Sequence, residues 1–508
     1  MMIMKTTFNI RYIFLSLLVV TCLSCSDDFL DVPVQGGEST TADPNLALKL
    51  VTGVYNSLMV GDSWGENGDV HGFAFITVTS IISDDADKGS TGSDQLVPVG
   101  DLDDFNTTST NKFAETLWSG HYNAIGNANQ TLKSLATTNL DAATLEQLEA
   151  QVKFLRGYLY FNLVRMYGGV PLVYRVPKDA AEANSDPAFS TRAKVEVVYD
   201  SIEKDLQYAA DHLPLKGQTA TGMVTKGSAQ AMLAKVYMYQ KDWAQVLALT
   251  NEVIGSGKYS LLDDYAQIWR QAGDNSAESI FEIETGVFNN TNLRVDNYSL
   301  SQGVRVGGKG GWNDLGWGFN NPSANLVNAY EPGDMRKDAT IIAIDNSGTH
   351  KGTKLWDDFR VPSSDSVQNL YYNYKAYTST SKEKYIMPSD KDRPKNIHIL
   401  RYADVLLMNA EAALHEGGDA AGPLNLVRER AKLGDKSGVT EADIWQERRV
   451  ELAMEHDRFW DLVRQGRAAQ VMHGVGKTNF VEGKNELLPI PNSQILLSGG
   501  KLEQNFGY

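Results

Sequence analysis

The feature that most constrains the fold is a series of long stretches in which apolar residues recur at helical spacing. In residues 143–167, leucines and other apolar residues follow one another at steps of three and four, and Gly168 opens the segment that ends the pattern. The same spacing extends over residues 43–61, 113–135, 194–212, 226–240 and 243–254. Amphipathic helices bury their apolar faces against one another. The sequence therefore predicts a mainly α-helical scaffold.

Two predicted helical hairpins resemble each other although they lie far apart in the chain. Residues 226–240 and 243–254 are joined only by Lys241 and Asp242, and a second pair covers residues 401–415 and 424–431. Small residues where the helices approach and large residues where they interlock are typical of tetratricopeptide hairpins. The sequence predicts a tetratricopeptide-like scaffold that a long segment interrupts.

That interrupting segment, residues 257–396, has a different composition. It contains the run Gly307-Gly308-Lys309-Gly310-Gly311, four of the nine tryptophans and few sustained helical periods. We predict long loops with small β insertions here. The early segment 61–111, with His71 and many aspartates, has a similar composition and is also predicted to form loops. Loops on a rigid scaffold often carry binding residues, so we expect the ligand contacts in these two segments.

The N-terminus predicts export and lipidation. Lys5 and Arg11 precede an apolar run that is too short to span a bilayer. Ser24 before Cys25 looks like a bacterial lipobox, which makes Cys25 the predicted site of lipid attachment; an ordinary cleaved signal would leave a free thiol. The predicted division is a signal peptide in 1–24, a lipidated tether in 25–42 and one domain in 43–508, with parts 43–256, 257–396 and 397–508.

Charge and cysteine content limit the possible partners. The chain has a formal net charge of -16 and a sequence pI near 5.0. Binding to nucleic acid or to anionic lipid needs basic patches, so we expect no nucleic-acid partner. No cysteine follows Cys25, so the exported domain depends on its hydrophobic core and not on disulfides.

Catalytic and cofactor motifs are not supported. The glycine run that ends at Gly310 resembles a phosphate-binding loop, but Gly310 occupies the position that requires Ser or Thr. A second run resembles the start of a calcium-binding loop without completing it. Its residues Asp84, Asp85 and Asp87 could form a solvated acidic loop or a nonspecific cation site. The mature chain has no HExxH spacing and no GxSxG elbow. We predict no catalytic residue, no cofactor and no metal, although two facing carboxylates would suffice for a glycosidase.

Dense charge in residues 445–467 suggests a structural role. Glutamates and arginines recur there at steps of three and four, which favours ion pairs along one helix over an acid–base pair. The residues concerned are Glu447, Arg448, Arg449, Glu451, Glu455 and Arg458. The terminal stretches 489–491 and 504–508 are predicted to pack back on the helices.

Taken together, six motifs resemble the SusD/RagB family of outer-membrane lipoproteins, and the resemblance covers nearly the whole mature chain. They are residues 25–30 (CSDDFL), 154–171 (FLRGY to RMYGGVP), 234–237 (AKVY), 400–407 (LRYADVLL), 447–462 (ERR to FWDL) and 488–508 (LPIP to QNFGY).

The resemblance implies a nutrient-binding role. Members of this family hold glycans or peptides over a SusC-type, TonB-dependent transporter. Asp27 and Asp28, directly after the lipidated position, are similar to the signals that direct lipoproteins of this kind to the outer face of the outer membrane. The alternative is a solvated spacer with no sorting role. We expect noncovalent glycan binding by a lipid-anchored protein of the cell outer membrane. Oligopeptide capture, a surface glycoside hydrolase and a pure assembly scaffold remain alternatives.

Aromatic residues in polar settings are the candidate ligand contacts. An exposed Trp or Tyr ring can stack on a sugar while polar neighbours bind the hydroxyl groups. Trp312, between Gly311 and Asn313, is the first candidate. Trp64, Trp356 and Tyr372 follow. Each of these rings could instead belong to the hydrophobic core. For Trp317, a position in the core is the preferred interpretation.

Replacing Trp312 and Trp64 together by alanine tests the first two candidates. Loss of a ring stacked on a sugar should weaken glycan affinity by about 1–3 kcal/mol, which calorimetry can measure. Unchanged affinity in the double variant would remove both residues from the site.

Overall fold

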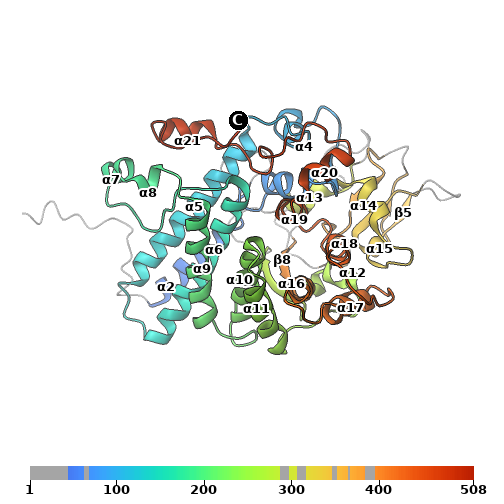
Figure 1. Cartoon of the computed structure of the whole chain (residues 1–508), viewed down its shortest axis with the longest axis horizontal. Helices are drawn as coiled ribbons and strands as arrows, with labels where there is room; N and C mark the ends of the chain where they lie inside the picture. Colours follow the sequence, from blue (N-terminus) through green and yellow to red (C-terminus); the bar gives the residue numbers. More distant parts are fainter. Residues whose placement is uncertain are drawn as a thin grey trace, which may run out of the picture.

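The computed structural model describes residues 44–61, 68–285, 297–305, 316–345, 352–363, 367–383 and 395–508. It has the predicted mainly α-helical fold with small β insertions (Figure 1). Long helices of the N-terminal part lie side by side, and the loop-rich insertion lies beside the C-terminal helices. No helix in these ranges is long and apolar enough to cross a membrane.

The long N-terminal helices match the predicted stretches closely, whereas the short helices α3, α4, α7 and α8 were not predicted. They are α2 (Pro44–Ser57), α3 (Phe73–Ile76), α4 (Asp101–Asp103), α5 (Lys112–Leu135), α6 (Ala142–Tyr167), α7 (Ala180–Ser185), α8 (Pro187–Ser190), α9 (Val195–His212), α10 (Lys226–Gln240) and α11 (Trp243–Gly255). Local capping explains their ends. The Asp141 carboxylate accepts a hydrogen bond from the Thr144 N–H at 3.0 Å, and Gly168, with φ +74°, ends α6.

The insertion and the C-terminal part contain shorter elements. Their helices are α12 (Tyr265–Ile268), α13 (Asn297–Gln302), α14 (Ala324–Ala329), α15 (Arg336–Thr340), α16 (Tyr402–His415), α17 (Ala421–Arg430), α18 (Glu441–Glu451), α19 (Arg458–Arg464), α20 (Ala468–Gly474) and α21 (Asn492–Leu497). Three further turns of helix are η2 (Thr77–Ile81), η3 (Leu96–Gly100) and η4 (Gln271–Gly273).

The strands of the described residues form four two-stranded antiparallel sheets. These sheets pair β1 (Ala86–Gly89) with β3 (Phe319–Pro322), β2 (Ser279–Ile283) with β8 (Ile397–Arg401), β4 (Ile341–Ala343) with β7 (Tyr371–Asn373), and β5 (Thr353–Lys354) with β6 (Arg360–Val361). The β2–β8 pair joins the start of the insertion to its end, with Glu282 opposite His398. The two ends of the insertion therefore lie side by side, next to the helical frame.

This arrangement brings the two predicted hairpins together. The Asn409 side chain of α16 donates hydrogen bonds of 2.9 Å to Thr250 and Asn251 of α11. The His415 ring stacks on the Trp243 ring at a centroid distance of 4.2 Å. The hairpins α10–α11 and α16–α17 are thus neighbours in space although the insertion separates them in sequence.

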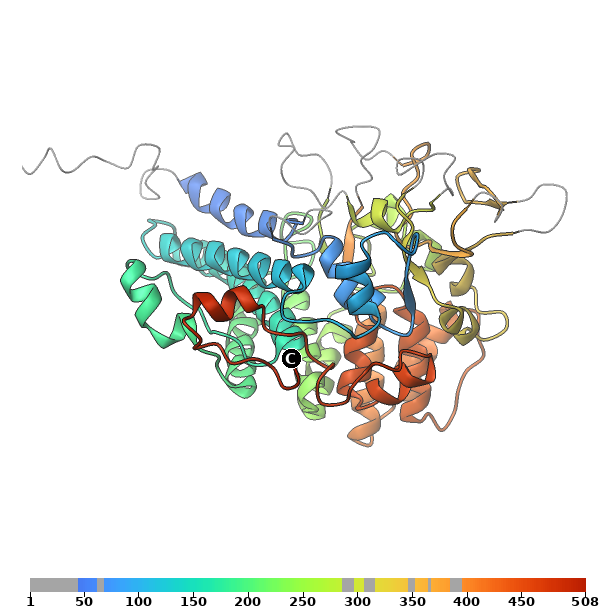
Figure 2. The same ribbon diagram turned by 90° about the horizontal axis from the view of Figure 1, so that it is seen from above.

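The C-terminal tail packs on the N-terminal helices, as predicted, and Figure 2 shows it crossing their face. The Leu488 N–H donates to the Met166 carbonyl oxygen at 2.7 Å, and the Asn505 side chain donates to the Tyr167 carbonyl at 3.1 Å. The tail therefore covers the end of α6.

The predicted single helix in residues 445–467 is wrong. The chain forms α18 and α19, and Met454 and His456 between them adopt positive φ of 65° and 74°. Partners from other elements hold this break. Glu455 binds Arg401 and Lys375, both at 2.7 Å, and the His456 ring lies 2.9 Å from both the Thr79 and Tyr298 hydroxyls. Tertiary contacts thus override the local helical pattern.

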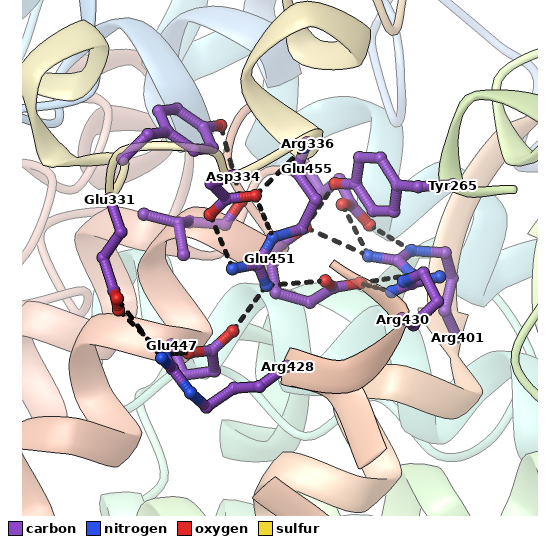
Figure 3. Close-up of polar contacts among 12 residues, drawn as sticks. Tyr265, Glu331, Asp334, Arg336, Arg401, Arg428, Arg430, Glu447, Glu451 and Glu455 are labelled. Carbon is purple, nitrogen blue, oxygen red and sulfur yellow. Dashed lines mark hydrogen bonds and ion pairs between the residues drawn. The ribbon is translucent and has the colours of Figure 1, made fainter. Parts of the chain in front are cut away.

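The predicted structural role of these charges is confirmed, but most of them pair between elements and not at steps of three and four along one helix. Glu451 is fully buried and binds Arg336 at 3.1 Å, Arg401 at 3.1 Å and Arg430 at 2.5 Å (Figure 3). Burial alone would raise the pKa of Glu451, but the three arginines outweigh it and hold that pKa well below its usual range. These pairs join α15, β8 and α17 to α18.

The early segment differs from the predicted binding loop as well. Residues 69–86 are buried, and the His71 ring lies between the Leu58 carbonyl and the Tyr158 hydroxyl, each at 2.7 Å. Burial lowers the pKa of His71 to about 3. Asp84 and Asp85 form neither a solvated loop nor a cation site, because Arg458 and Arg449 bind them at 2.7 Å.

Replacing Glu451 by glutamine should cost about 3–5 kcal/mol of the free energy of unfolding, because three buried arginines lose their shared counter-charge. Glu331→Gln is the matched control, since Glu331 also binds an arginine but its side chain is 42% exposed. That change should cost less than about 1 kcal/mol. Urea unfolding followed by tryptophan fluorescence measures both, and equal losses would contradict the structural role given to Glu451.

Candidate ligand-binding site

The predicted site residues fall into two groups. Cys25, Trp64 and Trp312 lie outside the described residues, so their roles stay predictions. Trp356 and Tyr372 are described, and both lie in the insertion. Their surroundings can be compared directly with the predicted stacking role.

Tyr372 occupies a core position. Its side chain is fully buried in an apolar cluster that includes Val304, Ile342 and Leu355. Its hydroxyl donates to the Arg305 carbonyl at 3.3 Å and accepts from the Asn369 N–H at 3.0 Å. No face of the ring is open to a sugar in this arrangement, so of the two interpretations of Tyr372 the structure places it in the core.

Trp356 is half-buried and contacts two cations. The Arg270 guanidinium lies 5.0 Å from the ring centroid and the Lys382 ammonium 5.6 Å. The Trp356 backbone N–H donates to the Tyr374 hydroxyl at 2.8 Å. These contacts fix the ring and occupy part of its π surface.

Near these residues a cavity of about 100 Å³ lies between α13 and the segment that follows β7. Its lining combines amides, hydroxyls and two aromatic rings. The residues are Ser299, Gln302, Gly303, Val304, Ile342, Phe359, Asn373, Tyr377, Thr378 and Thr380. Val304 and Gly303 lead into the sequence segment that contains Trp312.

Hydrogen bonds fix the amide groups of the wall. Gln302 Oε1 accepts from the side-chain amides of Asn320 at 2.7 Å and Asn373 at 2.8 Å, and its Nε2 donates to the Tyr298 carbonyl at 2.7 Å. The Ser299 and Thr378 hydroxyls lie 3.3 Å apart. Polar groups held in this way can bind hydroxyl groups with little loss of side-chain entropy.

Asp357 holds the aromatic side of the cavity. Its carboxylate accepts hydrogen bonds from the Tyr377 hydroxyl at 2.7 Å, the Ser379 hydroxyl at 2.6 Å and the Phe359 N–H at 3.2 Å. Burial and the neighbouring Asp357 raise the pKa of Tyr377. The Phe359 side chain stays 41% exposed, so its ring can meet a ligand.

A buried lysine supports the same region. Lys395 Nζ donates to the carbonyl oxygens of Trp269 at 2.8 Å and Tyr377 at 3.2 Å, and burial lowers its pKa to about 8. None of the described residues that line the cavity is an acid, a histidine, a cysteine or a lysine. This wall offers hydrogen bonds and ring surface, and it lacks the carboxylate pair of a glycosidase.

The sequence alone does not point to Gln302, Phe359, Asn373 or Tyr377. Along β7, successive side chains alternate between faces, which separates the core residue Tyr372 from the cavity-lining Asn373. Nothing local distinguishes Gln302 or Phe359, because the cavity forms only when segments distant in sequence meet.

Replacing Asp357 by alanine should lower the free energy of unfolding by about 1–3 kcal/mol, because two buried hydroxyls and a backbone N–H lose their acceptor. Asp358→Asn is the matched control, because asparagine tolerates the positive φ of 68° at this position. Asp358 binds Lys354 and Lys382, but its side chain is 65% exposed, so we expect no measurable change. Denaturant unfolding of both variants tests this, and a comparable loss in Asp358→Asn would argue against the holding role of Asp357.

The chain is similar to known proteins along most of its length. A family model described as "Starch-binding associating with outer membrane" matches residues 66–238, and one described as "SusD family" matches residues 277–508. SusD-like protein P2 of Formosa agariphila is 27% identical over 97% of this chain and 98% of its own.

Two solved structures are similar along nearly their whole length. A laminarin-binding SusD-like protein matches with a TM-score of 0.74 and 29% identity, over 91% of this chain and 99% of its own. Surface glycan-binding protein A from Bacteroides thetaiotaomicron, in complex with laminarihexaose, matches with a TM-score of 0.74 and 25% identity over the same shares. Together with the two family models, these similarities show that the chain belongs to the SusD/RagB family.

Proposed function

We propose that this chain is a cell-surface lipoprotein that captures a glycan and delivers it to a SusC-like, TonB-dependent transporter of the outer membrane. The observation that carries the proposal is the cavity beside α13, whose wall combines fixed amides, hydroxyls and an exposed aromatic ring. This is the chemistry that binds a sugar, which has hydroxyl groups at its edge and C–H groups on its faces.

The proposed ligand class is a neutral glycan, with laminarin-type glucan as the first candidate. Two structural relatives are a laminarin-binding protein and a complex with laminarihexaose. The lining of the cavity carries no charged side chain among the described residues, which suits an uncharged ligand. A basic peptide would need carboxylates at the same place.

Attachment through Cys25 fits this role. Lipid chains on one residue hold a domain at a membrane without a spanning helix. The tether in residues 25–42 would leave the domain free to approach the transporter, and the -16 charge disfavours direct binding of the domain to anionic lipid. Delivery to the transporter rests on family membership.

The experiment that tests the proposal is calorimetry of residues 26–508 against laminarin, starch and other plant, host and microbial glycans, with a peptide mixture in parallel. The products are checked for cleavage. Saturable binding of one glycan without cleavage supports glycan capture. Binding of peptides alone would favour the peptide alternative, cleavage would favour the hydrolase, and no binding at all would favour an assembly scaffold.

Phe359→Ala tests the cavity itself. Loss of the exposed ring should weaken glycan binding by about 1–2 kcal/mol, which is about 5- to 30-fold, with little effect on folding. Phe506→Ala is the control, because Phe506 is 80% exposed and does not line the cavity. If both variants bind as tightly as the unchanged chain, the glycan binds elsewhere.

A further inference from the structure

A second group of side chains lies at the β2–β8 sheet, and none of them lines the cavity described above. Asp274 follows η4, and Glu282 and His398 face each other across β2 and β8. One ligand atom from each residue lies within 4.8 Å of the other two. In tetrahedral zinc sites, bonds of about 2.1 Å place neighbouring ligand atoms roughly 3.4 Å apart. The three groups therefore have the spacing of a metal site.

The His398 ring gives an independent indication. Its side chain is 4% exposed, and Nδ1 lies 3.0 Å from Glu282 Oε1, close enough for an ion pair but not aligned for a hydrogen bond. A buried nitrogen without a hydrogen-bond partner is costly. Two ligands of one metal ion approach each other in this way, because their lone pairs point at the ion and not at each other.

Surrounding groups orient the carboxylate. The Asn396 side chain donates to Glu282 Oε2 at 2.9 Å, and the Asn275 N–H donates to both Glu282 oxygens at 3.1 and 3.2 Å. The edge of the Trp269 ring packs on His398 at a centroid distance of 5.2 Å. Outer contacts of this kind hold ligands in place in metal sites.

The local charge suits a cation. The same two asparagines bind Glu284 at 2.9 and 3.1 Å, so three carboxylates gather here. Cations beside them are Lys216, whose ammonium donates to the carbonyls of Ser276 and Ser279, and the buried Lys395. With His398 neutral as a ligand, the three carboxylates outnumber these two ammonium groups, and a bound cation would offset the remaining negative charge.

A path for an ion exists beside the cluster. A cavity of about 180 Å³ lies against β2, and its lining includes Lys216, Thr221, Gly222, Asn275, Ser279 and Glu282. The cluster is thus buried but lies next to open space.

We propose that Asp274, Glu282 and His398 form a binding site for a divalent transition metal ion of the zinc class. One imidazole and two carboxylates suit zinc, whereas calcium and magnesium prefer oxygen ligands alone. The site links the start of the insertion to its end, so the bound ion would stabilise the β2–β8 pair.

The test is titration of the full chain, purified in detergent and freed of metal with EDTA, with zinc chloride. We expect one equivalent to bind at micromolar concentration or below, and the melting temperature to rise. Asp274→Asn, a change at a half-buried position, should weaken binding about tenfold or more. His398→Gln should do the same, with folding checked by circular dichroism.

His415→Gln is the matched control. His415, Glu411 and Glu441 form the other His–carboxylate group of the described residues, with His415 partly exposed, and its loss should leave zinc affinity unchanged. No binding at millimolar zinc would show that Glu282 and His398 are only an ion pair and would overturn the proposal. Binding that survives Asp274→Asn, or that is lost in His415→Gln, would overturn it equally.

Discussion

The buried carboxylate of Glu451 is the contact on which the C-terminal half depends. It binds an arginine from the insertion, one from the end of β8 and one from α17, namely Arg336, Arg401 and Arg430. A buried arginine without a carboxylate is strongly unfavourable, so these three segments can pack around α18 only together. None of these residues lines the cavity beside α13. The frame is therefore held by contacts that a change of ligand need not disturb.

A second buried cluster joins the two helical halves in the same way. Four cations meet four carboxylates, namely Arg165, Lys235, Arg448 and Arg464 with Asp404, Glu411, Asp457 and Asp461. Arg165 and Lys235 come from α6 and α10, and the other six residues belong to the C-terminal part. Because each charge has a partner at a defined position, a shift of one helix past another would leave charges unpaired. Balanced charge thus specifies how the halves fit together.

The sequence predicts helices well where their causes are local. The stretch 143–167 becomes α6 with a difference of one residue, because apolar spacing, the Asp141 cap and Gly168 all lie in the stretch itself. The break between α18 and α19 could not be predicted, because Glu455 and His456 are held by residues from distant segments. The partners of Asp84 and Asp85 were missed for the same reason, since Arg449 and Arg458 lie more than 360 residues further along the chain.

The candidate site shows the same division between local and distant causes. The composition of the insertion is enough to predict that the candidate site lies there. It is not enough to predict which residues form the site. Gln302 becomes a wall residue only because Asn320 and Asn373 donate to its side-chain oxygen. Asn373 belongs to β7, a three-residue strand paired with β4 alone. Asn373 forms no ion pair of the two buried charge clusters, so a change at this position would alter the cavity wall without removing a charge contact that holds the frame.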